Sequence, residues 1–188
     1  MAACLPMSRI ILLNGVGSAG KSSIARALQQ ITTKPFLHVS MDSFLDMLPA
    51  AYLDHPDGFT FRTILQEGAP AVAIETGALG AQLMRGMRRA MAGLAAEGNH
   101  LIIDDVMLGS DAEEYRIQLA AHEISFVGVM APLAVLEQRE RDRKDRMIGL
   151  ARWQYDRVHQ GLDYDLTVDT GSESPALCAA RIKDALGL

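Results

Sequence analysis

Several residue types are scarce in this sequence, and each scarcity excludes a class of protein. Among 188 residues only Cys4 and Cys178 are cysteines, and they stand near opposite ends of the chain. Two such cysteines do not make the disulfide framework of a small secreted domain, so we expect a reducing, cytoplasmic setting. No apolar run approaches the roughly 18 residues of a membrane-spanning helix, and no basic segment leads into one. We therefore expect neither a membrane anchor nor a signal peptide.

Positive charge and asparagine are also in short supply. The formal net charge is −5, so no diffuse basic field favours nucleic acid as a partner. Neither Asn14 nor Asn99 belongs to an N-K-x-D guanine-reading motif, which argues against a GTPase switch. The five histidines show no metal-ligand spacing, so zinc is not expected. What is plentiful is hydrophobic residues, at 49%, which suits one compact domain over residues 1–188.

One stretch organises the rest of the chain. Four apolar residues, 10–13, lead into a glycine-rich turn and then into an apolar pattern of helical period that begins at Ile24. Strand, turn and helix in this order are the context of the phosphate-binding motif G-x-x-x-x-G-K-[ST]. Every position of that motif is satisfied by Gly15, Val16, Gly17, Ser18, Ala19, Gly20, Lys21 and Ser22.

The chemistry of a polyphosphate explains these residue types. Glycines let the loop turn its backbone N–H groups inward, and the helix that follows presents the positive end of its dipole. Lys21 reaches the outer phosphates, and the Ser22 hydroxyl is a ligand for the accompanying Mg²⁺. A glycine-rich hairpin beside a surface lysine does not fit the strand and helix around the motif. We therefore predict binding of ATP and Mg²⁺ at residues 15–22, with Ser23 and Arg139 as further nucleotide contacts.

Alternating strand and helix patterns predict an α/β fold with a five-stranded parallel sheet and helices on both faces. We expect strands near residues 10–13, 36–39, 100–106, 124–130 and 166–168, and a long helix over 71–97. Ligands of such sheets bind at the carboxyl ends of the strands. Residues 50–70 mix turn residues with aromatics, and we interpret them as a substrate-side insertion with a possible hairpin tip at Asp57-Gly58.

Two acids follow the apolar strand near residue 103. Asp104 and Asp105 stand where a phosphate-loop protein places the carboxylate that holds Mg²⁺. Many buried strands end in Asp, so the pattern has weight only with the phosphate loop upstream. The sequence leaves open which of the two acids faces the metal, with a slight preference for Asp104.

A further acid, Asp42, follows the second strand. A kinase needs a carboxylate that accepts the proton of the acceptor hydroxyl, and Asp42 is placed for that role. Asp is also a frequent N-cap, and a helix start at Ser43 would explain it equally well. Spacing alone does not decide between base and cap.

Residues 137–146 are almost all charged. Arg139, Arg143 and Arg146 are spaced i, i+4, i+7, so a helix would carry three guanidinium groups on one face. Such a face, in a lid over about residues 137–147, would close over the phosphates and offset transition-state charge. The alternative is a solvated helix with internal pairs such as Glu137–Arg141 and Asp142–Arg146.

The ordered set of motifs resembles the chloramphenicol phosphotransferase family of P-loop kinases. The resemblance rests on L-N-G-x-x-S-A-G-K-S, on M-D-S around Asp42, on I-I-D-D-V around Asp104, on R-x-x-R from Arg143 to Arg146, and on Y-D-x-x-V-D-T up to Thr170. It runs from about residue 10 to the last helix. The phosphate loop alone is shared with very many kinases, whereas the ordered set is far more specific.

The resemblance implies an ATP-dependent O-phosphotransferase that acts on a hydroxyl of a small molecule, chloramphenicol or a related compound, and a role in antibiotic resistance. It implies a fold like that of nucleotide and shikimate kinases. It matches Asp42 to the family's catalytic base, Lys21 and Ser22 to its phosphate-loop residues, and Arg143 and Arg146 to its lid arginines. Residues 52–70, which should border the acceptor, show little that matches the family.

Two other hypotheses remain open. A nucleoside or nucleotide kinase would grip the acceptor's phosphate with basic residues such as Arg62, Arg85, Arg88 or Arg89. An ATP-binding switch would act through a partner, although Asp42 and the arginines argue against it. The sequence leaves the acceptor and the oligomeric state, a homo-oligomer among the possibilities, undetermined.

Overall fold

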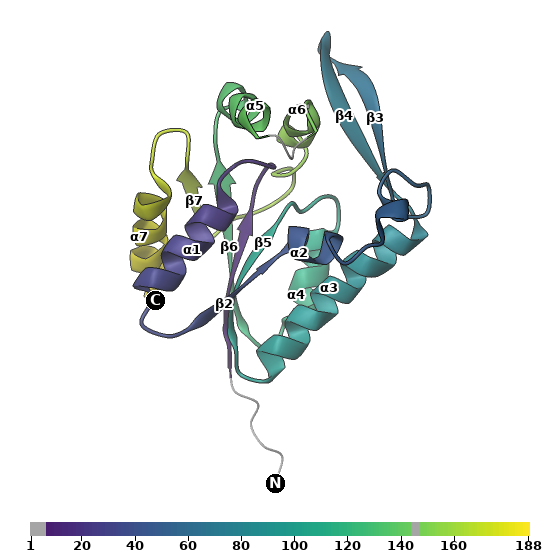
Figure 1. Cartoon of the computed structure of the whole chain (residues 1–188). Coiled ribbons are helices and arrows are strands. Elements are labelled where there is room, and N and C mark those ends of the chain that lie inside the picture. The colour runs from purple at the N-terminus through teal and green to yellow at the C-terminus, as the bar shows by residue number, and fades with distance from the viewer. Residues whose placement is uncertain (1–6, 144–146) are drawn as a thin grey trace.

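A parallel β-sheet forms the centre of the computed structural model, which describes residues 7–143 and 147–188 (Figure 1). Its five strands lie in the order β2-β5-β1-β6-β7. Their bounds are β1 (Arg9–Asn14), β2 (Phe36–Ser40), β5 (His100–Asp105), β6 (Glu123–Met130) and β7 (Leu166–Asp169). The predicted α/β fold and its five parallel strands are thereby confirmed.

Helices cover both faces of this sheet. On one face lie α1 (Lys21–Ile31) and α7 (Pro175–Leu186), and on the other α3 (Ala78–Ala96) and α4 (Asp111–Gln118) (Figure 1). Ile11 and Leu13 of β1 belong to the core beneath the first pair. Ile10 and Leu12 belong to the core beneath the second. A strand buried on both faces has to be apolar throughout, which explains the unbroken run before the glycine-rich loop.

The carboxyl ends of three strands meet at one edge of the sheet. Asp104 is in register with Leu13 of β1 and with Ser40 of β2, and Asp105 is in register with Asn14. The loop after β1, the helix after β2 and the acids that end β5 therefore start from the same level. This shared edge positions the candidate site described below.

A two-stranded antiparallel hairpin stands apart from the sheet (Figure 1). It consists of β3 (Phe59–Gln66) and β4 (Ala69–Thr76) and follows the short 3-10 turn η1 (Ala50–Tyr52). The insertion expected over residues 50–70 thus extends six residues further. The hairpin turns at Glu67 and Gly68, whose φ angles are 52° and 77°, and the tip proposed at Asp57-Gly58 is wrong.

The long helix expected over 71–97 is wrong in its first part. Residues 71–76 form β4, and α3 begins at Ala78. Val72 and Ile74 pair across the hairpin with Thr63 and Phe61. A short run of alanine and β-branched residues suits either structure, and pairing with β3 decides in favour of the strand.

Three short helices complete the architecture: α2 (Met41–Leu45), α5 (Leu133–Asp142) and α6 (Leu150–Tyr155). The side chain of Ser40 caps α2 by accepting a hydrogen bond from the Ser43 backbone N–H. Within residues 7–143 and 147–188, no helix has both the length and the apolar character needed to cross a membrane.

Candidate active site

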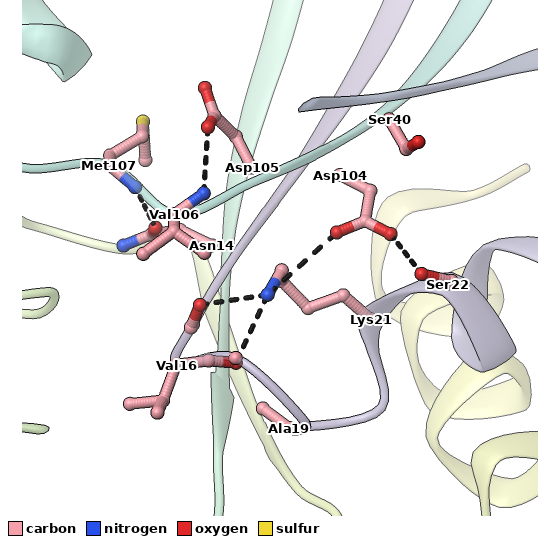
Figure 2. Close-up of polar contacts among 12 residues, drawn as sticks. Asn14, Val16, Ala19, Lys21, Ser22, Ser40, Asp104, Asp105, Val106 and Met107 are labelled. Carbon is pink, nitrogen blue, oxygen red and sulfur yellow. Dashed lines mark hydrogen bonds and ion pairs between the residues drawn. The ribbon is translucent and has the colours of Figure 1, made fainter. Parts of the chain in front are cut away.

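The glycine-rich loop leaves β1 and turns into the first turn of α1 (Figure 2). A Cβ atom on Gly15 would lie 2.5 Å from the Val129 carbonyl oxygen, so a glycine is required where β1 passes β6. Gly20 has a φ of 90°, which favours glycine for a second reason. The side chains of Val16 and Ala19 are buried in the core, so only their backbone can face a ligand. The other loop residues line a cavity, namely Gly17, Ser18, Gly20, Lys21, Ser22 and Ser23.

Lys21 and Ser22 meet Asp104 at the start of α1 (Figure 2). The buried Lys21 ammonium donates to the carbonyl oxygens of Gly15 and Val16 at 2.9 and 3.1 Å. Its Nζ also lies 3.8 Å from Asp104 Oδ1. The Ser22 hydroxyl donates to Asp104 Oδ2 at 2.5 Å. Three residues that the sequence assigned to ATP and Mg²⁺ are thus in direct contact.

The surroundings of Asp104 favour its charged form. Burial raises the pKa of this carboxyl, but the imidazole of His38, the ammonium of Lys21 and the hydroxyl of Ser22 together outweigh burial, so its pKa lies below the usual value. His38 Nε2 lies 3.5 Å from Asp104 Oδ2 and has no hydrogen-bond partner among the described residues. A charged carboxylate and a serine hydroxyl are hard oxygen ligands of the kind that Mg²⁺ prefers.

Asp105 has a different environment although it is the next residue. Its Oδ2 accepts the phenolic hydrogen of Tyr115 at 2.7 Å, and its Oδ1 accepts the Val106 backbone N–H at 2.7 Å. Complete burial is the main reason that the pKa of Asp105 rises to about 6. The two acids therefore differ in charge preference and in what they contact, and only Asp104 bonds to the phosphate loop.

Asp42 lies in the first turn of α2, and it is not the N-cap. Ser40 occupies the capping position, which removes the structural explanation that the sequence had left open. The Asp42 carboxylate lines the same cavity as Lys21, Ser22 and Asp104. Because α2 follows the edge strand β2, Asp42 belongs to the β2 side of the sheet.

The cavity into which these side chains converge has a volume of about 1280 Å³. It is lined on one side by the glycine-rich loop, Arg139 and Thr170. On the other side its apolar lining comes from α2, the hairpin and α3, with Leu45, Phe59, Phe61, Ile74 and Met84. A cavity of this size has room for a nucleotide and a second small molecule.

Three arginines were predicted to share a helical face, but Arg139 and Arg143 do not share one. Helix α5 ends at Asp142, and Arg143 has extended backbone angles of −94° and 121°. Arg139 donates to the Thr170 hydroxyl at 3.0 Å and to its carbonyl at 2.7 Å. Arg143 lines the cavity beyond the helix end. Arg146, and with it the end of the expected lid, lies outside the described residues.

Of the two ion pairs expected for a solvated helix, Glu137–Arg141 does not form, and Asp142–Arg146 lies outside the described residues. Glu137 forms its ion pair with Arg152 of α6, and Arg141 donates to Gln138. Glu140 is buried, and its two carboxylate oxygens accept the backbone N–H groups of Gly149 and Ala151 at 2.7 and 2.8 Å. An acid turned inward in this way joins the end of α5 to the start of α6.

Two further residues, Gln154 and Thr170, bond to the backbone of the phosphate loop. Gln154 of α6 is buried, and its Oε1 accepts the Gly17 backbone N–H of the phosphate loop at 2.8 Å. The hydroxyl of Thr170 donates to the Ala19 carbonyl oxygen at 2.8 Å and so joins β7 to the same loop. The sequence pointed to Thr170, because it follows the last predicted strand at the edge where ligands bind, but it gave no signal for Gln154 or for His38.

Comparison with known proteins agrees with the geometry. The model of the family described as chloramphenicol phosphotransferase-like protein matches residues 8–187. This chain belongs to that family. A curated protein of Mycobacterium tuberculosis strain H37Rv, named "Putative O-phosphotransferase", is 29% identical over 173 residues, which are 88% of this chain and 76% of its own. The resemblance inferred from the ordered motifs is therefore confirmed.

Solved structures share the fold at low sequence identity. A sugar kinase of Janibacter sp. HTCC2649 gives a TM-score of 0.67 at 16% identity over 97% of this chain and 95% of its own. The APS kinase CysC of Mycobacterium tuberculosis, solved with AMPPNP and APS, gives 0.65 at 17% over 97% and 99%. The tunicamycin resistance protein of Deinococcus radiodurans gives 0.65 at 18% over 96% of both chains. With the family match, this confirms a kinase-like phosphotransferase, an enzyme of the small-molecule kinase type.

Proposed function

We propose that this protein transfers the γ-phosphoryl group of ATP to a hydroxyl of a small molecule, with Asp42 as the base. The supporting observation is that Asp42, Lys21, Ser22 and Asp104 line one cavity at the shared edge of three strands. We call the half of this cavity at residues 15–23, Arg139 and Thr170 the nucleotide end. The half lined by α2, the β3–β4 hairpin, α3 and α4 is the acceptor end.

At the nucleotide end, the backbone of the glycine-rich loop and the dipole of α1 would bind the phosphates. Lys21 would exchange its two loop carbonyl partners for phosphate oxygens. Ser22 and Asp104 would hold Mg²⁺, which when bound offsets the negative charge of the phosphates. The contacts of Asp105 with Tyr115 and Val106 favour a structural role for that acid instead.

Transfer itself would depend on the acceptor end. The Asp42 carboxylate accepts the proton of the acceptor hydroxyl while the hydroxyl oxygen bonds to the γ-phosphorus and ADP leaves. Arg139 lies beside the nucleotide end, where it donates a hydrogen bond to the Thr170 carbonyl oxygen, and Arg143 lies where the chain leaves α5. They would counter the charge of the transferring group, and the same role for Arg146 remains a prediction.

The acceptor is proposed to be chloramphenicol or a related hydroxylated compound, in keeping with the name of the family. The apolar lining of the acceptor end suits a compound with an aromatic or aliphatic body. A nucleotide acceptor has less support. Of the four basic residues named for it, Arg62 and Arg89 are not in the cavity lining, and Arg88, which is, already pairs with Asp111 and Glu114. An ATP-dependent switch would have no use for an acceptor-sized cavity beside Asp42.

The test is a phosphoryl-transfer screen against hydroxylated antibiotics and metabolites, with and without Asp42. Replacement Asp42→Asn removes the proton acceptor while preserving shape, so we expect transfer to fall about 10²–10⁴-fold with ATP affinity retained. Asp54→Asn, at an exposed turn outside the cavity, is the matched control. Near-normal transfer by Asp42→Asn would remove Asp42 from the role of base.

A further inference from the structure

A buried glutamine of α6 holds one peptide unit of the phosphate loop. Gln154 is 4% exposed and lines the cavity. Its Oε1 accepts the Gly17 backbone N–H at 2.8 Å. That N–H belongs to the peptide between Val16 and Gly17, whose carbonyl oxygen accepts a hydrogen bond from Lys21 Nζ at 3.1 Å (Figure 2). The carboxamide of Gln154 and the ammonium of Lys21 therefore bond to the same peptide of the loop.

The nitrogen of this carboxamide is available to a ligand. Because the Gly17 N–H needs an acceptor, the oxygen of Gln154 takes the loop side, and Nε2 keeps two hydrogens to donate. Within residues 7–143 and 147–188, Nε2 donates to no protein atom, and the enclosed side-chain atoms that lack a partner belong to Thr32, His38 and Arg88 instead. An amide nitrogen that is neither bonded nor enclosed, on a buried residue of the cavity lining, has to face the cavity.

Contacts at both ends of α6 fix this donor before any ligand binds. At the start of the helix, the carboxylate of Glu140 accepts two backbone N–H groups at 2.7 and 2.8 Å. Just after the helix, the Val158 carbonyl oxygen accepts the buried Asn14 Nδ2 of β1 at 2.7 Å. A donor held in place in this way needs no reorganisation when charge develops beside it, which is the condition for strong electrostatic stabilisation.

The position of Lys21 indicates which part of ATP this donor would meet. In a phosphate loop the lysine reaches the outer phosphates, while the inner ones lie against N–H groups of the loop and the helix start. Lys21 Nζ bonds to the peptide that Gln154 also holds, and not to the opposite end of the loop at Gly20. Gln154 therefore belongs to the outer end of the phosphate chain, where the γ-phosphoryl group leaves.

We propose that Gln154 is a further catalytic residue, which donates a hydrogen bond from Nε2 to an oxygen of the γ-phosphoryl group. This rests on the proposed function and deepens it. The bond from the γ-phosphorus to ADP breaks, the bond to the acceptor oxygen forms, and the hydroxyl proton goes to Asp42. Gln154 neither gains nor loses a proton. It holds the transferring group against the loop and offsets its charge, as a neutral donor beside the cation of Lys21.

Two substitutions separate a contact with the γ-phosphate from a purely structural role. Gln154→Glu keeps an acceptor for the Gly17 N–H but has no N–H to donate. Gln154→Met is uncharged and keeps neither group. If Gln154 only holds the loop, Gln154→Glu should bind nucleotides as the wild type does. If it also contacts the γ-phosphate, both variants should lose affinity for a triphosphate selectively.

The measurement is calorimetric titration of Mg²⁺–AMPPNP and of Mg²⁺–ADP into the full chain. For both variants we expect the affinity for AMPPNP to fall about 10–100-fold and that for ADP by about threefold or less. Gln160→Met and Gln160→Glu, at an exposed position outside the cavity lining, are the matched controls and should change neither affinity. Thermal unfolding checks that each variant folds. If Gln154→Met does not, Gln154→Asn replaces it, because it is neutral and withdraws the carboxamide by one methylene group.

The second readout is phosphoryl transfer at saturating ATP. We expect kcat to fall about 10²–10³-fold for Gln154→Met, with the acceptor KM near that of the wild type.

Two results would overturn the proposal. One is an equal change in AMPPNP and ADP affinity for both variants, which would leave Gln154 with the loop contact alone. The other is an unchanged kcat for Gln154→Met. A wild type that binds no nucleotide would instead overturn the proposed function itself. If nucleotides bind but no acceptor is phosphorylated, the transfer reaction fails, while the two titrations still decide whether Gln154 contacts the γ-phosphate.

Discussion

The nucleotide end is formed mainly by backbone and by buried side chains that bond to one another, whereas the acceptor end is formed by side chains from a hairpin and three helices. At the first, the ammonium of Lys21, the hydroxyl of Ser22 and the carboxylate of Asp104 are already in contact. At the second, the apolar residues of the lining come from segments far apart in the sequence. A site made of backbone fixes one ligand class, and a site made of side chains can change its ligand by substitution.

The largest expected effect is at the nucleotide end. Replacement Lys21→Ala removes the cation that we propose to contact the phosphates, so we expect turnover to fall about 10²–10³-fold and nucleotide affinity to fall with it. ATP titration by calorimetry and a coupled kinase assay measure the two effects. Lys34→Ala, an exposed lysine beyond α1, is the control. An unchanged ATP titration for Lys21→Ala would refute the assignment of the phosphate loop.

The next effect concerns Asp105, at the border between the two ends. Burial raises its folded pKa to about 6, above the ordinary value of 3.8, so its contribution to stability is complete below pH 3.8 and is lost as the pH rises through 6. The neutral variant Asp105→Asn should not lose this stability. Its free energy of unfolding should exceed that of the wild type by about 3 kcal/mol at pH 7.5, with little difference at pH 4.

Urea unfolding across this pH range, in buffer with EDTA, measures the difference between Asp105→Asn and the wild type. The exposed Asp163→Asn should show no such trend. A constant difference at all pH values would show that Asp105 does not titrate in this window, and that the border between the two ends carries no such pH dependence.

Substitution of Glu140 tests whether a change in one structural contact affects both the nucleotide end and the acceptor end. Its carboxylate positions the start of α6. Toward the nucleotide end, Gln154 of α6 bonds to the phosphate loop. Toward the acceptor end, the carbonyl oxygen of Gly149, just before α6, accepts the Val72 N–H of the hairpin. Glu140→Gln replaces one of the two acceptor oxygens by an NH₂ donor, so that one backbone N–H loses its acceptor. We therefore expect about 2 kcal/mol of lost stability in urea unfolding, and poorer binding at both ends. Asp142→Asn, exposed on the same helix, should cost about 0.5 kcal/mol or less. Equal losses for the two variants would mean that the ends are independent.

The smallest effect separates the acceptor end from the rest. Ile74 and Leu65 belong to the same hairpin, but only Ile74 lines the cavity, and Leu65 is 77% exposed. For Ile74→Ala we expect the acceptor KM to rise about three- to tenfold, with ATP binding unchanged. Leu65→Ala should change neither quantity. A rise in the KM for ATP with Ile74→Ala would erase the distinction between the ends.

The same contrast explains what the sequence could predict. The sheet, the phosphate loop and the edge at Asp42 and Asp104 follow from local patterns, because a buried strand and a glycine-rich turn depend on neighbours in the chain. The hairpin was missed over residues 71–76, where helix and strand patterns coincide. Gln154 and Glu140 were missed because their roles depend on partners reached only by folding, such as Gly17 and Gly149.

The inward carboxylate of Glu140 has a consequence for how this enzyme can diverge. Because one buried side chain of α5 bonds to the backbone at both Gly149 and Ala151, the start of α6 keeps its place beside α5 whatever residues lie on the exposed face of α5. Relatives can therefore exchange exposed residues of α5, such as Arg141 and Asp142, without moving α6. Variation on that exposed face and inheritance of the scaffold become separate evolutionary problems.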